Sequence, residues 1–441
     1  MESGNRDSGL VRVVGLIALA ASMISMLVGA AIFVVPAHLS AALGSLAPLA
    51  MMACAVAIGA IGVCLAESGS RVPSSGGIYA SVEAAFGPCA GYVGGTLFWV
   101  SNVMACAAVS SALGDAVAVV LPQSIRSIAH ATVVVGTVGA ICAINIGGVA
   151  RGMRLVSFAT LLKLIPLAIF LGVGVFAIEG TNFIRPAAIS PADVGHTLLL
   201  TLFAFQGFET VLCASGEVRD PARTIPRALL IALFAVTLLY TAVQIVAQGI
   251  LGPSLGHSNV PLADAMGKIH PALQLLMLTG AAVSMFGWIT ADLLSSPRIL
   301  FAFARDGLLP RSLGRLSQRG RAPYMAIACY GILATVLALS GSFAQLAAPS
   351  ALVLAALYIA GCAASWQLVR REVAQAGAPL GFRWIGTAVI VGSTSMLALI
   401  VLASRTEILG LLVLTGLSLA AYLVQTKVLY PRTADPRQPA A

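Results

Sequence analysis

Three residues that are poorly suited to contact with lipid lie close together in one apolar segment. Between Leu198 and Ala214 the chain is apolar enough to cross a bilayer, yet its centre contains Gln206, Gly207 and Glu209. A glycine in a helix interior costs about 1 kcal/mol relative to alanine. An ionisable group at the bilayer centre costs at least about 2.5 kcal/mol. We therefore expect a membrane helix that is interrupted at its middle for a functional reason.

Two other ionisable side chains are expected at membrane depth. At 1.5 Å per residue, Lys163 lies about 15 Å along its helix from Gly152. By the same measure, Asp292 lies about 20 Å before Arg305. Charged residues inside membrane helices are functional candidates by default. The alternative for Lys163 is a side chain that bends toward the interface, and the alternative for Asp292 is an acid that hydrogen-bonds a neighbouring helix without a further role.

Small residues gather in the middle of the first apolar segment. Gly29, Ala30 and Ala31 precede Ile32, and Pro36 follows one turn later. A helix can unwind at such a group. The alternative is a continuous helix whose small residues pack closely against a neighbour.

The composition is that of a membrane protein. Of 441 residues, 59% are hydrophobic and 9% are charged, whereas about a quarter of the residues of a soluble protein are charged. Windows of about 20 apolar residues predict twelve helices, near residues 13–40, 46–66, 89–121, 128–147, 155–178, 194–216, 228–251, 273–303, 324–341, 345–369, 384–404 and 407–430. The first window follows a polar start and is longer than a signal-peptide core, so we expect no cleavable signal peptide.

The basic residues support this helix count. With both termini in the cytoplasm, the Lys and Arg residues on the outer side are Arg126, Arg185, Lys268 and Arg405. Lys163 lies within a helix, and the remaining basic residues fall on the inner side, as the positive-inside rule requires. One helix more or fewer in the middle would remove this asymmetry.

The sequence gives no support to other kinds of site. The eight cysteines have no metal-ligand spacing, so we expect free thiols that pack between helices. The histidines are scattered, and no nucleophile and base pair, metal cluster or phosphate loop is present. We expect no enzyme, cofactor, metal ion or nucleic-acid partner.

An ion pair is expected before the loop that follows the second helix, and a short helix is expected after it. We expect this helix to end at Glu67, with Glu67 and Arg71 forming an interfacial ion pair. Glycine and proline then break the chain, and residues Ile78 to Phe86 are expected to form a short amphipathic helix.

Four stretches of the chain resemble one family of membrane proteins. They are AFQGFE with the later EVRDPARTIPRA, the loop SSGGIYASVEAAFGP, the segment NIGGVARGMRLVSFATLLKLIP, and ARDGLLP with the later APYMAI. Over roughly residues 10–345, the chain resembles the amino acid, polyamine and organocation (APC) transporter superfamily. It is similar to bacterial amino acid permeases and to the arginine/agmatine antiporter group.

The resemblance implies an all-α integral membrane protein with a LeuT-like fold. Residues 11–178 would form the first inverted repeat and residues 179–371 the second, each of five helices. The opening helix of each repeat would be broken, at Gly29 and at Gly207, which indicates a binding site at the midplane. Residues 372–430 would add two helices, and residues 1–10 and 431–441 would be cytoplasmic tails.

The resemblance also implies how an amino acid would bind. Backbone N–H groups from Gly29 to Ile32 would receive the carboxylate, because the start of a half-helix carries partial positive charge. Unwound carbonyl groups near Gly207 would receive the ammonium. Family members commonly have Gly-Ser-Gly at the first break, whereas this chain has two alanines, which removes a hydroxyl contact and narrows the pocket.

The substrate side chain would lie toward Cys106, Phe203 and Asp292, and Phe203 or Phe205 would close over it. Asp292 would bind a substrate ammonium, pair with Lys163 or carry a coupling proton. Lys163 would occupy the place where sodium-coupled relatives bind a cation and would tie the first helix to the fifth. Glu209 would respond to pH or transmit occupancy of the site, because a carboxyl group in a low dielectric has a raised affinity for protons.

The function implied is secondary active transport of an amino acid across the inner membrane by alternating access, as proton-coupled symport or as exchange. One alternative is a basic amino acid or polyamine antiporter. An alternative of another class is an amino-acid-binding sensor that moves nothing. The expected partners are an amino acid or amine, membrane lipid and a proton, and the last two helices would pack as a scaffold or against a second copy of the chain in a homodimer.

Overall fold

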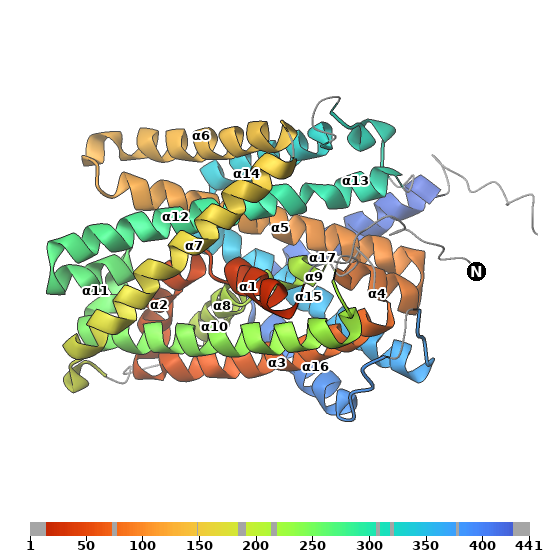
Figure 1. The fold of residues 1–441 in the computed structure, drawn as a ribbon, viewed down its shortest axis with the longest axis horizontal. Helices are drawn as coiled ribbons and strands as arrows, with labels where there is room; N and C mark the ends of the chain where they lie inside the picture. The colour runs from red at the N-terminus through yellow and green to blue at the C-terminus, as the bar shows by residue number, and fades with distance from the viewer. Residues whose placement is uncertain are drawn as a thin grey trace, which may run out of the picture.

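The computed structural model describes residues 15–72, 77–147, 149–183, 191–212, 218–305, 309–317, 322–375 and 379–426 (Figure 1). Within these residues the regular elements are helices, and there is no β-strand. The helices are α1 Leu16–Leu27, α2 Ala31–Leu43, α3 Ala47–Arg71, α4 Gly77–Phe86, α5 Pro88–Ala118, α6 Arg126–Ile146, α7 Val149–Gly174, α8 Pro191–Ala204, α9 Phe208–Leu212, α10 Pro221–Leu251, α11 Pro261–Ile269, α12 Pro271–Ser295, α13 Pro297–Arg305, α14 Tyr324–Ser340, α15 Phe343–Arg370, α16 Ile385–Leu402 and α17 Arg405–Val424.

Eight of the described segments are long and apolar enough to cross a membrane. They are Ala31–Arg71, Pro88–Ala118, Gln123–Ile146, Arg223–His257, Pro271–Ala304, Phe343–Arg370, Ile385–Leu402 and Arg405–Val424. Shorter apolar helices are found at Leu16–Leu27, Leu162–Ala177 and Tyr324–Ser340. The chain is therefore a multi-pass membrane protein, as its composition predicts.

Local sequence sets many of the helix ends. Proline stands in the first turn of α3, α5, α10, α11 and α12, where its missing N–H costs no hydrogen bond. Capping boxes start α15, with Ser342 and Gln345, and α17, with Ser404 and Glu407. Gly87 has φ +94° between α4 and α5, a conformation that glycine adopts without strain.

Two predicted helix boundaries differ from the structure. The second helix was expected to end at Glu67, but α3 continues to Arg71, because the residues between them carry no helix breaker. The eighth span was expected as one helix, but it is divided into α12 and α13 by a turn at Ser296, before Pro297. Proline removes a backbone donor and favours such a division. The short helix expected from Ile78 to Phe86 is α4.

The long helices differ in how deeply they lie within the protein. In the apolar windows of α5 and α15, 83% and 72% of residues are buried, against 6% in α17. Figure 1 shows α6 along one edge of the molecule and α3 toward the opposite edge, with α1 and α15 between them. The last residues of α1, Ser25, Met26 and Leu27, are buried, and the candidate site is formed at this end of the helix.

Candidate functional site

The helical backbone is interrupted at both glycines that the sequence singles out. Residues 28–30 separate α1 from α2, and residues 205–207 separate α8 from α9. Gly207 has φ +118°, and a Cβ atom there would come within 3.0 Å of the carbonyl oxygen of Met26. The two interruptions are therefore in contact.

The carbonyl end of α1 is held by side chains from three other helices. The last carbonyl groups of a helix have no partner within the helix and need one elsewhere. The hydrogen bonds run from Lys163 Nζ to Ser25 O, from Trp288 Nε1 to Met26 O at 2.9 Å, from Tyr240 OH to Leu27 O at 2.6 Å, and from Ser284 Oγ to Gly29 O at 3.2 Å. The break in α1 is thus fixed to α7, α10 and α12.

Lys163 is the charged member of this group. Its side chain is buried on α7 and donates to Ser25 O in the last turn of α1. A positive charge at this place suits the negative end of the α1 dipole. This hydrogen bond joins the helix that contains Lys163 to α1.

Gly29 is required by close packing. A Cβ atom at Gly29 would come within 2.8 Å of Cδ1 of Trp288. A larger residue would displace the indole ring and with it the hydrogen bond to Met26 O. The neighbouring Ala30, Ala31 and Ile32 are all buried.

The start of α2 presents N–H donors, whereas the end of α1 presents carbonyl acceptors. Its N-cap is Ala30, and no side chain caps it. The first N–H groups of a helix have no partner within the helix, so Ala31 and Ile32 carry donors that a carboxylate can use. Carbonyl groups at the end of α1 and N–H groups at the start of α2 therefore lie on the two sides of one break.

Glu209 lies in the first turn of α9, directly after the second interruption. Both of its carboxyl oxygens lie 2.9 Å from the backbone nitrogen of Gly207, which donates to them. The hydroxyl of Tyr358 on α15 donates to Oε2 at 3.0 Å. Glu209 is 1% exposed. It therefore holds the chain in the bent form at Gly207 and links that bend to α15.

Two aromatic residues flank the second interruption. The ring centroid of Phe205 is 5.4 Å from that of Tyr240, whose hydroxyl holds α1. The ring of Phe203 lies edge to face against Phe343, also at 5.4 Å. Phe205 therefore packs on the tyrosine that binds α1, whereas Phe203 packs on the first residue of α15.

A cavity of about 600 Å³ lies beside Phe343, and we call it the α2–α12 cavity. Its lining includes Phe33 and His38 of α2, Asp115 at the end of α5, Met285 of α12, and residues 256–260. None of the predicted substrate-binding residues lines it. It is nevertheless adjacent to them, because Phe33 follows Ile32 and Phe343 packs on Phe203.

The carboxyl group of Asp292 is hydrogen-bonded to side chains at the C-cap of α12, in α14 and in α5. Its carboxyl oxygens accept hydrogen bonds from Tyr330 at 2.5 Å and from Ser296 at 2.6 Å. A side-chain hydrogen bond also joins it to Cys106. Among the described residues, no ion pair joins Asp292 to Lys163. The structure therefore brings Cys106 and Asp292 together.

Several partners at the breaks were not found from the sequence. Tyr240, Ser284 and Tyr358 each donate to the interrupted segments. The only sequence signal was a hydroxyl group within an apolar helix, since a buried tyrosine usually finds a hydrogen-bond partner. That signal gives neither the partner nor the helix on which the partner lies.

The cysteines and the other potential metal ligands were located in the described residues. In the part of the chain that the structure describes, no three His, Cys, Asp or Glu residues are grouped to hold a metal ion. Seven cysteines are free, and Cys213 lies outside the described residues.

These features define an all-helical membrane protein in whose interior two interrupted segments meet. A model of the family described as amino acid permease matches residues 14–418. The chain therefore belongs to the amino acid permease family, and the resemblance to the APC superfamily is confirmed.

The relatives are bacterial transporters. The serine/threonine exchanger SteT of Bacillus subtilis is 29% identical over 348 residues, which cover 76% of this chain and 78% of SteT. The branched-chain amino acid permease BcaP of the same organism is 25% identical over 413 residues, covering 88% and 86%. An uncharacterized transporter of Mycobacterium tuberculosis is 31% identical over 324 residues, covering 71% and 70%.

Proposed function

We propose that this protein is a secondary active transporter of small neutral amino acids that works by alternating access. The contact between Gly207 and Met26 O carries the proposal, because it brings two interrupted segments together inside the membrane domain. Helix ends that meet in this way present backbone donors and acceptors to one small ligand. An amino acid carries both complementary charges.

The helices can be assigned to twelve spans in an inverted repeat. α1 with α2 opens the first repeat, which continues through α3, α5, α6 and α7. α8 with α9 opens the second, which continues through α10, α12, α14 and α15, and α16 and α17 follow. Both termini would lie in the cytoplasm and the protein in the plasma membrane. α17, with 6% of its apolar window buried, would face lipid or a second copy of the chain.

The substrate would bind between the interruptions. Its carboxylate would accept from the N–H groups at Ala31 and Ile32, and its ammonium would donate to carbonyl groups at the end of α8. Phe203 would lie between this site and the α2–α12 cavity, because its ring packs on Phe343 in the cavity wall. The cavity would then be the path from the outside.

The buried acids support a neutral substrate. Both carboxyl oxygens of Asp292 and both of Glu209 already accept hydrogen bonds from the protein. The side-chain cation of a basic amino acid could pair with Asp292 or Glu209 only if these hydrogen bonds were broken. The names of the relatives, which mention serine, threonine and branched-chain amino acids, point the same way.

Lys163 supports a mechanism without sodium. Its buried ammonium occupies the carbonyl end of α1, a place suited to a cation. A fixed cation here leaves substrate exchange or proton coupling as the source of energy. We favour exchange, since one relative is named as an exchanger.

Transport by purified protein in liposomes tests the proposal. Vesicles loaded with unlabelled serine should take up radiolabelled serine, and external alanine, threonine or leucine should compete while arginine should not. Competition by arginine alone would support a basic amino acid antiporter. Saturable binding without any flux would support a sensor.

A further inference from the structure

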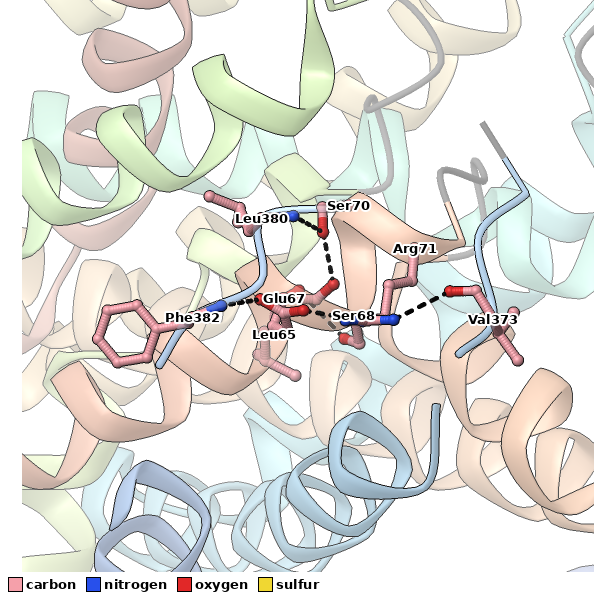
Figure 2. Close-up of polar contacts among 8 residues, drawn as sticks. All are labelled: Leu65, Glu67, Ser68, Ser70, Arg71, Val373, Leu380 and Phe382. Atoms are coloured by element: carbon pink, nitrogen blue, oxygen red, sulfur yellow. Dashed lines mark hydrogen bonds and ion pairs between the residues drawn. The ribbon is translucent and has the colours of Figure 1, made fainter. Parts of the chain in front are cut away.

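The C-terminal end of α3 is hydrogen-bonded to the segment between α15 and α16, which spans residues 371–384. Figure 2 shows Glu67, Ser70 and Arg71 of α3 facing backbone groups of this segment. Arg71 Nη1 donates to Val373 O at 3.2 Å, and the backbone nitrogen of Gln375 donates to Arg71 O at 2.9 Å. The first part of the segment is thus bound by both the side chain and the backbone oxygen of Arg71.

The second part of the segment is held by the same turn of α3. The backbone nitrogen of Phe382 donates to Glu67 Oε2 at 3.1 Å. The backbone nitrogen of Leu380 donates to Ser70 Oγ at 3.2 Å. Both described parts of the segment are therefore bound by residues within one helical turn.

The ion pair at the centre of these contacts is buried. Arg71 Nε lies 2.8 Å from Glu67 Oε1, and the two side chains are 8% and 0% exposed. The sequence predicts this pair as an interfacial one, and the structure confirms the pair but places it inside. A buried ion pair is retained only when its remaining donors and acceptors are satisfied, and here the α15–α16 segment satisfies them.

These contacts lie at the opposite end of α15 from the α2–α12 cavity. Phe343, at the start of α15, lines that cavity. α15 then runs for 28 residues to Arg370, about 40 Å at 1.5 Å per residue. The α2–α12 cavity therefore lies at the start of α15, and the hydrogen bonds between α3 and the α15–α16 segment lie beyond its end.

We propose that Glu67, Ser70 and Arg71 form a latch that holds the α15–α16 segment on α3 while the cavity is open, and that the latch must release when the opposite side opens. This inference rests on the proposed alternating access. In that mechanism α3 moves with α1, α2 and α8–α10, whereas α16 stays behind. The three residues are positioning residues, since they act through the segment and touch no substrate.

The contact between Ser70 and Leu380 allows a direct test. The double variant Ser70→Cys/Leu380→Cys places one thiol on each of two residues that are now joined by a 3.2 Å hydrogen bond from the backbone nitrogen of Leu380 to Ser70 Oγ. A disulfide or a short bis-methanethiosulfonate bridge, verified by peptide mass spectrometry, would fix the segment to α3. Serine exchange in liposomes should then fall about ten-fold or more, as expected when one of two states is locked, and should return after dithiothreitol.

The controls separate this inference from the proposed function. Wild-type protein treated with the same oxidant or bridging reagent reports any effect on the native cysteines. Wild-type protein without flux would overturn the proposed function itself. Full exchange in the bridged variant, beside an active wild type, would overturn the latch alone.

A second variant does not depend on forming the bridge. Glu67→Gln removes the charge from the latch and should favour the state open to the opposite side. The external KM for serine should rise about five-fold, the lower range of a typical coupling between sites, without a parallel loss of Vmax. Glu372→Gln is the matched control, because it makes the same change at an exposed position of the same segment. An unchanged KM in Glu67→Gln, or a loss of Vmax alone, would overturn the latch.

Discussion

Gly207 lies against the carbonyl oxygen of Met26, so that a Cβ atom at Gly207 would come within 3.0 Å of that oxygen. Met26 O is at the same time the acceptor for the indole N–H of Trp288. One carbonyl group therefore lies between the bend at Gly207 and the side chain that covers Gly29. The geometry of both interruptions depends on this point, which makes it the first target for substitution.

Gly207→Ala should abolish exchange. Alanine at φ +118° is strained, at a cost of about 1–3 kcal/mol for a sparsely populated conformation, and its methyl group would press on Met26 O. The strain should straighten the bend and separate the two helix ends. Exchange of labelled serine in liposomes measures the loss, after the amount of folded protein is checked by gel filtration.

Gly59→Ala is the control for this substitution. Gly59 lies within α3, and a Cβ atom there would meet no atom within 4 Å. Replacing this glycine should leave exchange unchanged and should raise stability by up to about 1 kcal/mol. Equal activity of the two alanine variants would contradict the role assigned to the bend.

The sequence singles out Gly29 and Gly207 but does not predict which side chains contact the segments around them. Gly29 and Gly207 were visible because glycine and polar residues are conspicuous in apolar segments. The partners of the freed carbonyl groups come from α7, α10 and α12, far away in the chain. Tyr240 and Ser284 look like ordinary residues of an apolar helix, since the acceptor is a backbone atom that no sequence pattern marks.

The contacts of the buried acids also could not be predicted from the sequence. The sequence predicts Asp292 at membrane depth, but the direction of its side chain depends on how α12 is rotated, and its carboxyl group accepts a hydrogen bond from Tyr330. The sequence predicts Glu67 and Arg71 as an interfacial ion pair at the end of the helix. Their burial could not be predicted, because it is produced by a segment that begins about 300 residues later.

Lys163→Met should slow exchange by at least about ten-fold. A hydrogen bond to a charged group contributes about 1.5–3 kcal/mol, and without the ammonium the carbonyl end of α1 loses its tie to α7. Initial rates of serine exchange measure the effect. Lys268→Met is the matched control, because Lys268 donates to the backbone oxygen of Ile250 at 3.0 Å, away from both interruptions. A similar loss in both variants would show that the effect is not specific to α1.

Glu209→Gln should leave ligand binding largely intact and should flatten the pH dependence of uptake. The amide oxygen of glutamine can still accept from the N–H of Gly207, so the bend is preserved, but the side chain no longer titrates. Tyr358→Phe removes the neighbouring hydrogen bond of 3.0 Å and retains the carboxyl group, so its pH profile should keep its shape. Uptake measured from acidic to neutral pH compares the three proteins. A profile in Glu209→Gln that matches the wild type would remove Glu209 from the coupling mechanism.

Asp292→Asn should lower stability without changing the choice of substrate. The carboxyl group accepts from Tyr330 and Ser296, and asparagine offers one acceptor oxygen where there were two. Loss of one such bond costs about 1–3 kcal/mol when its donor stays buried. The melting temperature in detergent should therefore fall, while the relative inhibition of serine exchange by alanine and by arginine should stay the same.

Tyr330→Phe tests the same contact from the opposite side. It removes the hydroxyl that donates to Asp292 Oδ2 at 2.5 Å and keeps the ring, which packs edge to face on Trp99. Because both substitutions break one hydrogen bond, they should lower the melting temperature by similar amounts, and the double variant should be less than additive. A changed ratio of arginine to alanine inhibition in Asp292→Asn alone would instead place this carboxyl group at the substrate, and the assignment of a neutral amino acid would have to be abandoned.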